Sequence, residues 1–262
     1  MSNDTDELIH EVAGGIARVT LNRPKARNAL TFPMYERLAD ICRTMPTDGS
    51  VKAMVITGAG DKAFAAGTDI STFLDFNTPE QGLEYEASAD RHFSAFETCP
   101  VPTIAAIAGA CTGGGAGIAA CCDLRIATAD MKFGFPIART LGNCLSVATL
   151  ARLVALVGEP RVKDMILTSR LIGAEEALAI GLVNEVVPDH PALMTRVEEL
   201  AGTLALHAPL TMRATKDLLL RLREQGAKAD DRDWVGRIYA SADFKEGREA
   251  FLAKRKPQWT GR

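Results

Sequence analysis

Residues 111–118 read Cys-Thr-Gly-Gly-Gly-Ala-Gly-Ile and are the most informative stretch of the chain. Three successive glycines precede an apolar run of the kind that forms a helix. The first N–H groups of a helix have no intrahelical acceptor. Such groups bind negatively charged oxygen. The stretch therefore predicts an oxyanion site at a strand-to-helix corner.

A second corner of the same kind occurs earlier in the chain. Residues 64–70 read Phe-Ala-Ala-Gly-Thr-Asp-Ile, after an apolar strand and before an expected helix that begins near Asp69. One corner alone is explained equally well by a tight turn that requires glycine. Two corners in register would hold one carbonyl oxygen between them.

A dinucleotide-binding loop is an alternative interpretation of the glycines at 113–117. That fingerprint needs a third glycine three residues after the second, and an acidic residue about 20 positions further on. The glycines of residues 113–118 lack this spacing. The sequence also has no phosphate-loop motif, nucleophile elbow or metal-binding His-Glu pattern.

Strands alternate with helices before the chain turns helical. Strands are expected at 15–21, 53–58, 103–107 and 124–127, and helices at 33–43 and 116–122. This alternation predicts an α/β protein, but strand length does not distinguish a doubly wound sheet from a spiral of β-β-α units. After residue 188, helical periodicity predicts helices at 193–206, 209–224 and 231–256. We therefore expect a core at 1–195 and a C-terminal helical oligomerisation region at 196–262.

Composition limits the classes of partner. The 262 residues are 47% hydrophobic and 24% charged, as in a globular protein with a full core. The formal net charge of -3 argues against nucleic acid or an anionic membrane as partner. No apolar run reaches the roughly 18 residues of a membrane span, and the acidic start of the chain lacks the pattern of a secretory signal. We expect a cytoplasmic protein whose six cysteines are reduced core residues.

The two corners and three further motifs resemble the crotonase (enoyl-CoA hydratase/isomerase) superfamily over nearly the whole chain. The further motifs are Leu-Asn-Arg-Pro-Lys-Ala-Arg-Asn-Ala-Leu at 21–30, Gly-Leu-Val-Asn-Glu-Val-Val at 181–187 and Phe-Leu-Ala-Lys-Arg at 251–255. The resemblance implies a ClpP/crotonase spiral of β-β-α units, a C-terminal region that builds a homotrimer or a dimer of trimers, and an acyl-CoA substrate. It implies no cofactor beyond the coenzyme A of the substrate.

The resemblance also implies the roles of individual residues. The backbone N–H groups of Thr68 and Gly114 correspond to the two donors of the family's oxyanion hole, which stabilises a thioester enolate. Residues that match the coenzyme A site are Lys25, Ala26 and Arg27 around the nucleotide, Ala66, Asp69 and Ile70 along the adenine and pantetheine, and Phe251 and Lys254, which often close the nucleotide site from an adjacent protomer. Without the family pattern, the basic residues are a solvated turn and Asp69 is a helix cap.

The family's two hydratase glutamates are missing. Their matching positions hold Gly117 and Ile137, which cannot transfer protons. A standard two-glutamate hydration is therefore doubtful, because each acid or base contributes roughly 10²- to 10⁴-fold to the rate.

Other side chains are candidates to replace the missing acids. They are Asn143 and His92, with Glu84, Glu86 and Cys144 as further possibilities, although a charged residue on a helix is more often solvated and a cysteine more often inert. We predict a lyase or isomerase acting on acyl-CoA thioesters. The alternatives are a CoA-ester decarboxylase, a hydrolase, another lyase and a non-catalytic acyl-CoA-binding protein.

Overall fold

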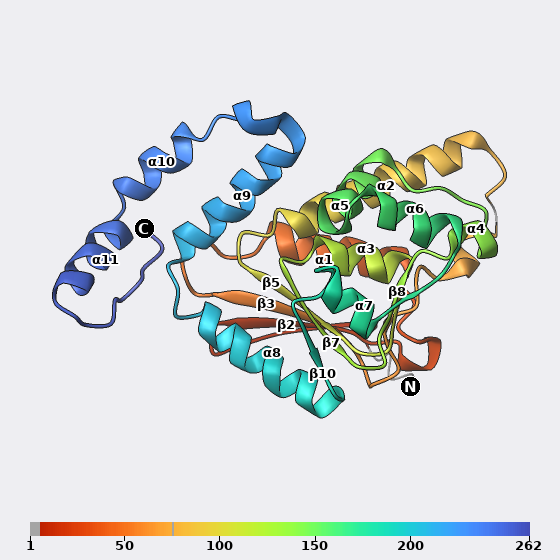
Figure 1. Cartoon of the computed structure of the whole chain (residues 1–262), viewed down its shortest axis with the longest axis horizontal. Coiled ribbons are helices and arrows are strands. Elements are labelled where there is room, and N and C mark those ends of the chain that lie inside the picture. The colour runs from red at the N-terminus through yellow and green to blue at the C-terminus, as the bar shows by residue number, and fades with distance from the viewer. Residues whose placement is uncertain (1–5, 75) are drawn as a thin grey trace.

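The computed structural model describes residues 6–74 and 76–262 (Figure 1). Within these ranges the strands form two sheets, with strand orders β1-β2-β3-β5-β7-β10 and β4-β6-β8-β9. The strands are β1 (Leu8–Ala13), β2 (Ile16–Leu21), β3 (Ala53–Gly58), β4 (Ala63–Ala65), β5 (Thr103–Ile107), β6 (Ala110–Thr112), β7 (Leu124–Thr128), β8 (Lys132–Gly134), β9 (Ile172–Gly173) and β10 (Glu185–Val187). In the larger sheet, β1 is antiparallel to β2 and the other neighbours are parallel.

Successive strands alternate between the two sheets. Each of β3, β5 and β7 lies in the larger sheet and is followed by β4, β6 or β8 of the smaller one. A helix then returns the chain, namely α2 (Pro79–Glu97), α3 (Gly114–Cys121) or α4 (Ile137–Thr140). This repeat confirms the predicted spiral of β-β-α units and excludes a doubly wound sheet.

The parallel strands are buried on both faces. In β3, Met54 and Ile56 pack into one apolar cluster while Val55 packs into a second cluster on the opposite face. This division follows the period of two along a strand. The first cluster lies under α1 (Phe32–Arg43), α2 and α3, and the second lies against α8 (His190–Leu204). Burial on both faces explains why these strands read as continuous apolar runs.

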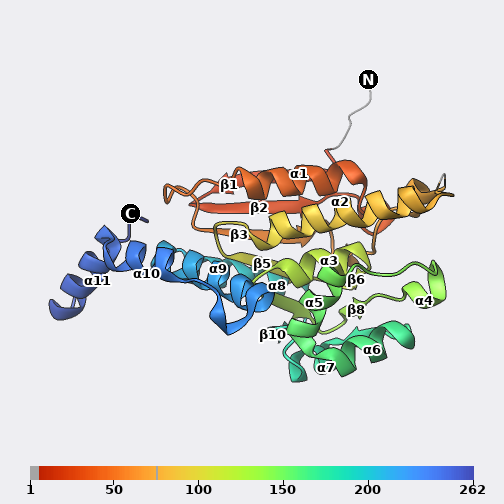
Figure 2. The same ribbon diagram turned by 90° about the horizontal axis from the view of Figure 1, so that it is seen from above.

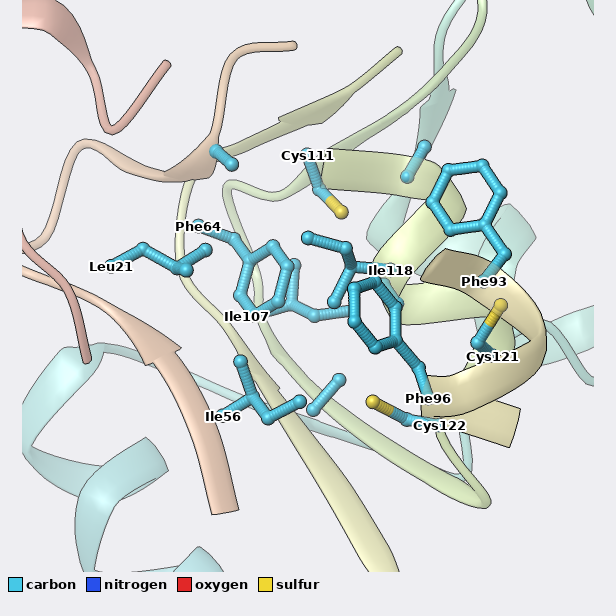
Figure 3. Close-up of a cluster of buried hydrophobic side chains, with 14 of the residues drawn as sticks. Leu21, Ile56, Phe64, Phe93, Phe96, Ile107, Cys111, Ile118, Cys121 and Cys122 are labelled. Atoms are coloured by element: carbon cyan, nitrogen blue, oxygen red, sulfur yellow. The ribbon is translucent and has the colours of Figure 1, made fainter. Parts of the chain in front are cut away.

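Two phenylalanines of α2 belong to the first cluster. Figure 3 shows Phe93 and Phe96 in one cluster with Ile118 of α3. Five of the six cysteines are buried thiols, as expected, whereas Cys144 is exposed. The expectation that all six are core residues is therefore wrong for Cys144, because it lies in the irregular segment between α4 and α5.

The helix expected to begin near Asp69 starts ten residues later. Asp69 caps only a short 3-10 helix, η2 (Ile70–Phe73), by accepting a hydrogen bond from the Ser71 N–H. The long helix α2 begins at Pro79, behind a capping box formed by Thr78 and Gln81. A capping box supplies acceptors for orphan N–H groups at a helix start, so it defines the true beginning of the helix.

The remaining helices complete the spiral and extend away from it. They are η1 (Pro24–Ala26), α5 (Val147–Val157), α6 (Glu159–Leu167), α7 (Ala174–Ala179), α9 (Pro209–Gln225), η3 (Gly226–Lys228), α10 (Arg232–Tyr239) and α11 (Ala242–Leu252). The expected single helix at 231–256 is two helices, because Ser241 interrupts it and caps α11. The expected boundary at residue 195 falls inside α8, whose Leu193, Val197 and Ala201 pack on the sheet.

Figures 1 and 2 show α9, α10 and α11 projecting from one end of the spiral. Large apolar side chains are exposed on this arm, among them Leu219, Tyr239 and Phe251. No helix in the described ranges is both long and apolar enough for a bilayer span.

The carboxylate of Glu97 is one of the groups that connect the arm to the spiral. Glu97, at the end of α2, accepts hydrogen bonds from Arg152 of α5 (3.0 Å) and from Nη2 of Arg223 of α9 (2.7 Å). Burial would raise the pKa of Glu97, but the hydrogen bonds and charges of the two arginines outweigh it and lower the pKa. The Glu97 side chain is 16% exposed and that of Arg152 is 5% exposed, so both charges depend on their pairing.

We expect Glu97→Gln to lower the free energy of unfolding at pH 7 by about 3 kcal/mol, because it leaves buried arginine charge unpaired. The lowered pKa means that the contribution of Glu97 is complete above its unfolded-state pKa of about 4.3 and is lost as the pH falls through its folded-state value. The difference from wild type should therefore shrink in acid. Urea unfolding at several pH values measures it, with the exposed Glu175→Gln as control. A loss below about 0.5 kcal/mol would mean that the network is a weak surface cluster.

Candidate active site

The two glycine corners lie against each other. Strands β4 and β6 run parallel, with Ala65 opposite Cys111, so the corners that follow them are neighbours. A Cβ atom on Gly113 would lie 3.4 Å from Cα of Gly67, and one on Gly115 would lie 2.4 Å from the carbonyl oxygen of Ala65. Gly113 and Gly67 also have φ angles of 52° and 116°. Glycine is required here both by close approach and by backbone conformation.

Each corner directs one free N–H group. Leu30 bonds to the carbonyl of Gly67 and to the N–H of Asp69, both at 2.8 Å. Thr68 lies between the two residues that bond to Leu30. In a parallel bridge such a residue points its own N–H away from the partner strand, so the N–H of Thr68 faces away from Leu30. Gly114 is the first residue of α3. Within the described residues, neither N–H has a backbone acceptor.

Thr68 and Gly114 line the same cavity, which has a volume of about 660 Å³. Most of its wall is aromatic and aliphatic, and its acidic lining residues are Glu80, Glu84 and Glu86. No lysine or arginine of the described residues lines it. The structure therefore brings the two predicted donors together at an apolar cavity.

The positions of Gly117 and Ile137 are apolar in three dimensions as well. A Cβ atom on Gly117 would lie 2.5 Å from Cζ of Phe93, so an aromatic ring fills the space next to this glycine. Ile137 begins α4 and is part of the cavity wall. The first place has no room for a carboxylate without rearrangement, and the second holds an aliphatic side chain in its stead.

Glu86 is the cavity-lining group with a perturbed carboxyl pKa. Burial raises the pKa of Glu86, a hydrogen bond from the N–H of Ser146 lowers it, and the nearby charge of Asp90 raises it further. The bond from Ser146 is 3.2 Å long. A desolvated carboxylate in a cavity is the arrangement that general acid-base catalysis uses.

The two leading polar candidates from the sequence, His92 and Asn143, are placed differently. His92 lines the cavity, but its Nε2 lies 2.6 Å from Oε2 of Glu36 and its ring stacks on Tyr35. The hydrogen bond from His92 lowers the pKa of Glu36. Asn143 also lines the cavity and is exposed. Of the further candidates, Glu84 is exposed and paired with Arg91, and Cys144 does not line the cavity.

The sequence did not indicate two tyrosines, Tyr35 and Tyr85, that lie beside the first corner. Oη of Tyr35 lies 2.9 Å from Oγ1 of Thr68, and Oη of Tyr85 lies 3.4 Å from the same atom. Tyr85 lies on α2, between the candidate residues Glu84 and Glu86. Nothing in the sequence connects Tyr35 with Thr68, because α1 and the first corner meet only in the folded chain.

The residues expected around the nucleotide lie next to Ala66 of the cavity wall. Lys25 and Ala26 on η1 and Arg27 directly after it are exposed. The carbonyl of Arg27 accepts a hydrogen bond of 3.0 Å from the N–H of Ala66. Ala66 and Ile70 line the cavity. No acidic side chain in the described part of the chain pairs with Lys25 or Arg27.

Asp69 is engaged in structure. It caps η2 and pairs with Arg23 at 2.9 Å. Hydrogen bonds from Ser71 and Arg23 lower the pKa of Asp69. Its observed contacts are therefore those of a cap and an ion pair.

Within one chain, Phe251 and Lys254 do not lie with the other residues expected to bind coenzyme A. Figures 1 and 2 place α11 and α4 at opposite ends of the molecule. Phe251 is 84% exposed, and Lys254 follows the end of α11. A single chain therefore leaves these two residues far from the cavity.

Comparison with known proteins gives a family match over most of the chain. The enoyl-CoA hydratase/isomerase family model matches residues 11–262. The chain belongs to this family. The short-chain-enoyl-CoA hydratase of Clostridium acetobutylicum is similar to it, with 36% identity and 97% of each chain covered. The crotonyl-CoA hydratase of Syntrophomonas wolfei is 35% identical, with 96% of each chain covered.

Solved structures share the fold of this chain. An enoyl-CoA hydratase/carnithine racemase from Magnetospirillum magneticum is 37% identical with a TM-score of 0.91, covering 99% of this chain and 97% of its own. DspI of Pseudomonas aeruginosa is 32% identical with a TM-score of 0.88, covering 98% of each chain. The predicted family and fold are thereby confirmed.

Proposed function

We propose that this family member binds an acyl-CoA thioester with its carbonyl oxygen between the N–H groups of Thr68 and Gly114. The observation that carries the proposal is the convergence of these two free donors on one cavity. The names of its relatives support it, since both curated hydratases act on CoA thioesters. Each donor of such a hole contributes about 2.7–4 kcal/mol to the stabilisation of an enolate.

The reaction that follows is a proton transfer at the acyl group, in the lyase or isomerase class. Glu86 serves as the base in this proposal, because burial raises its pKa and it lines the cavity. Hydration by two glutamates is not supported, since Phe93 and Ile137 occupy the two places. Asn143 is proposed to orient the acyl group or a water, and the proposed role of His92 in proton transfer is secondary because Glu36 engages its Nε2.

The nucleotide part of coenzyme A is proposed to lie along the exposed turn of Lys25, Ala26 and Arg27, next to Ala66 and Ile70. Charge-assisted bonds from lysine and arginine suit its phosphates. Phe251 and Lys254 would complete the site from a second copy, in a homotrimer or a dimer of trimers. The exposed apolar side chains of the arm support such an assembly. No cofactor other than coenzyme A is required.

Decarboxylation of a malonyl-type thioester is the second candidate. It forms the same enolate by loss of carbon dioxide and needs no base. The apolar surroundings of Gly117 and Ile137 favour it, because a desolvated carboxylate loses carbon dioxide more readily than a hydrated one. The lack of lysine and arginine in the described cavity wall disfavours it, since the carboxylate would bind unpaired.

We expect Glu86→Gln to slow exchange of the α-protons of an acyl-CoA in deuterated water by about 10²-fold or more. The active form of Glu86 is the carboxylate, and its pKa is raised, so wild-type activity should fall with acid at a higher pH than the usual glutamate value of about 4.3. This acidic limb should be absent from the variant. Mass spectrometry of the recovered thioester across pH 4–9 measures both the rate of exchange and its dependence on pH.

A panel of saturated, enoyl and malonyl-type CoA thioesters tests the reaction class. Glu175→Gln, at an exposed position of α7, should behave as wild type. Carbon dioxide release that is unaffected by Glu86→Gln would select decarboxylation instead. Tight binding of the thioesters without turnover of any of them would indicate a non-catalytic acyl-CoA-binding protein. Fast hydration of crotonyl-CoA by the Glu86→Gln variant would refute the assignment of Glu86 as the base.

A further inference from the structure

Three hydroxyl groups form a chain beside the first corner. Tyr35 of α1, Thr68 of the corner and Tyr85 of α2 are linked by contacts of 2.9 and 3.4 Å, with Oγ1 of Thr68 in the middle. Thr68 belongs to this chain through its side chain and to the proposed oxyanion site through its backbone N–H. The end of the chain therefore lies next to the place where a thioester oxygen would bind.

Burial determines the direction of the chain. Three hydroxyls carry three protons, and two bonds use two of them. Tyr35 borders the cavity but is only 5% exposed, and a Cβ atom on Gly114 would lie 1.7 Å from its Oη, so Gly114 lies tightly against this hydroxyl. A buried donor without an acceptor costs about 1–3 kcal/mol, so Tyr35 donates to Thr68.

The third proton then remains on Tyr85. Once Tyr35 donates to Thr68, the hydroxyl of Thr68 donates to Oη of Tyr85, its other neighbour. Tyr85 is half-buried and lines the cavity. Its own O–H is thus left to face whatever occupies the cavity.

Aromatic neighbours hold the Tyr85 ring in place. The Phe73 ring meets it edge-on with 4.8 Å between centroids, and the rings of Phe32 and Phe76 lie at 5.9 and 6.1 Å. Rings packed at such distances restrict one another. A donor that is fixed before the substrate binds stabilises developing charge without the cost of reorganisation.

We propose that the Tyr85 hydroxyl is a third hydrogen-bond donor to the thioester oxygen, and that Tyr35 and Thr68 position it. The proposal rests on the proposed function, because it needs that oxygen to lie at the N–H groups of Thr68 and Gly114. No covalent bond changes at tyrosine: as charge develops on the oxygen, the bond from Tyr85 strengthens. Burial raises the pKa of Tyr85, so its hydroxyl stays protonated through neutral and mildly alkaline pH.

Tyr85→Phe tests the inference, because it removes the hydroxyl and keeps the ring. The probe is butyryl-CoA labelled with ¹³C at the thioester carbonyl. Difference infrared spectra should show the carbonyl stretch lowered on binding to wild type and lowered less in the variant. We expect the rate of α-proton exchange to fall about 10²- to 10³-fold, with the dissociation constant of butyryl-CoA changed far less.

Two further variants separate this role from a structural one. Glu175→Gln is the control, because Glu175 is exposed on α7 and lies outside the cavity lining. It should match wild type in both measurements. Tyr35→Phe should reproduce part of the loss although Tyr85 is intact, since Thr68 would then accept the proton of Tyr85.

The outcomes also distinguish the inference from the proposed function. If wild type leaves the carbonyl stretch of the bound probe unchanged, there is no oxyanion site and both proposals fall. A second outcome is that wild type and Tyr85→Phe lower the frequency of the carbonyl stretch equally and exchange α-protons at the same rate. The oxyanion site then stands, and the third donor is refuted. A normal Tyr35→Phe variant beside an impaired Tyr85→Phe variant would overturn the positioning role of Tyr35.

Discussion

Gly114→Ala is expected to lower kcat by about 10³-fold or more. A methyl group at this position would lie 1.7 Å from Oη of Tyr35 and 3.0 Å from Oγ1 of Thr68. Either Tyr35 moves or the first turn of α3 shifts. The N–H of Gly114 and the hydroxyl groups that contact Thr68 are therefore disturbed together. Loss of a single donor costs about 10²- to 10³-fold, and more than one is affected here. Turnover of the thioester panel measures the effect.

Gly202→Ala is the control for this change. Gly202 lies in α8, and a Cβ atom there would meet nothing within 4 Å. Alanine in a helix is more favourable than glycine by roughly 0.5–1 kcal/mol, so this variant should be fully active and slightly more stable. A Gly114→Ala variant that folds and turns over at the wild-type rate would show that catalysis does not use this corner.

Gly117→Glu is expected to destabilise the fold by about 3 kcal/mol or more without conferring hydratase activity. Its Cβ atom would lie 2.5 Å from Cζ of Phe93, which is itself 7% exposed in the core. The new carboxylate would also be buried in an apolar cluster. Restoring the family's residue alone therefore cannot restore its chemistry, because the neighbouring ring has taken the space.

A double-mutant cycle with Phe93→Ala tests this explanation. Phe93→Ala by itself should cost about 3–5 kcal/mol. The double variant should lose clearly less than the sum, since removal of the ring makes room for the glutamate. Urea unfolding of the four proteins measures the coupling. Additive losses would show that Phe93 is not what excludes an acid from position 117.

Much of the fold followed from local pattern. Buried strands such as 53–58 and 103–107 were located by their apolar runs, because strands covered on both faces need apolar residues at every position. The predicted start of a helix near Asp69 was wrong, because the cap there serves only four residues of 3-10 helix. The long C-terminal helix was predicted as one because apolar spacing continues across Ser241, where a cap starts a new helix.

The candidate site was only partly predictable. The two glycine corners were visible because free N–H groups at a helix start follow from local sequence. The raised pKa of Glu86 was not predictable, since it depends on burial and on Ser146, which comes from outside α2, whereas the charge of Asp90 lies four residues away on the same helix. The partner of His92 was equally hidden, because Glu36 comes from α1.

The amino-acid sequence by itself determined the class, the two corners and the lack of acids at Gly117 and Ile137, since each of these depends on residue type and short spacing. Only the tertiary structure decided what stands in their place. It put the Phe93 ring beside Gly117, and it joined Tyr35, Thr68 and Tyr85 into one hydroxyl chain. The physical reason is that hydrogen bonds and steric exclusion act over a few ångströms in space, and the spiral brings together atoms that the chain keeps tens of residues apart.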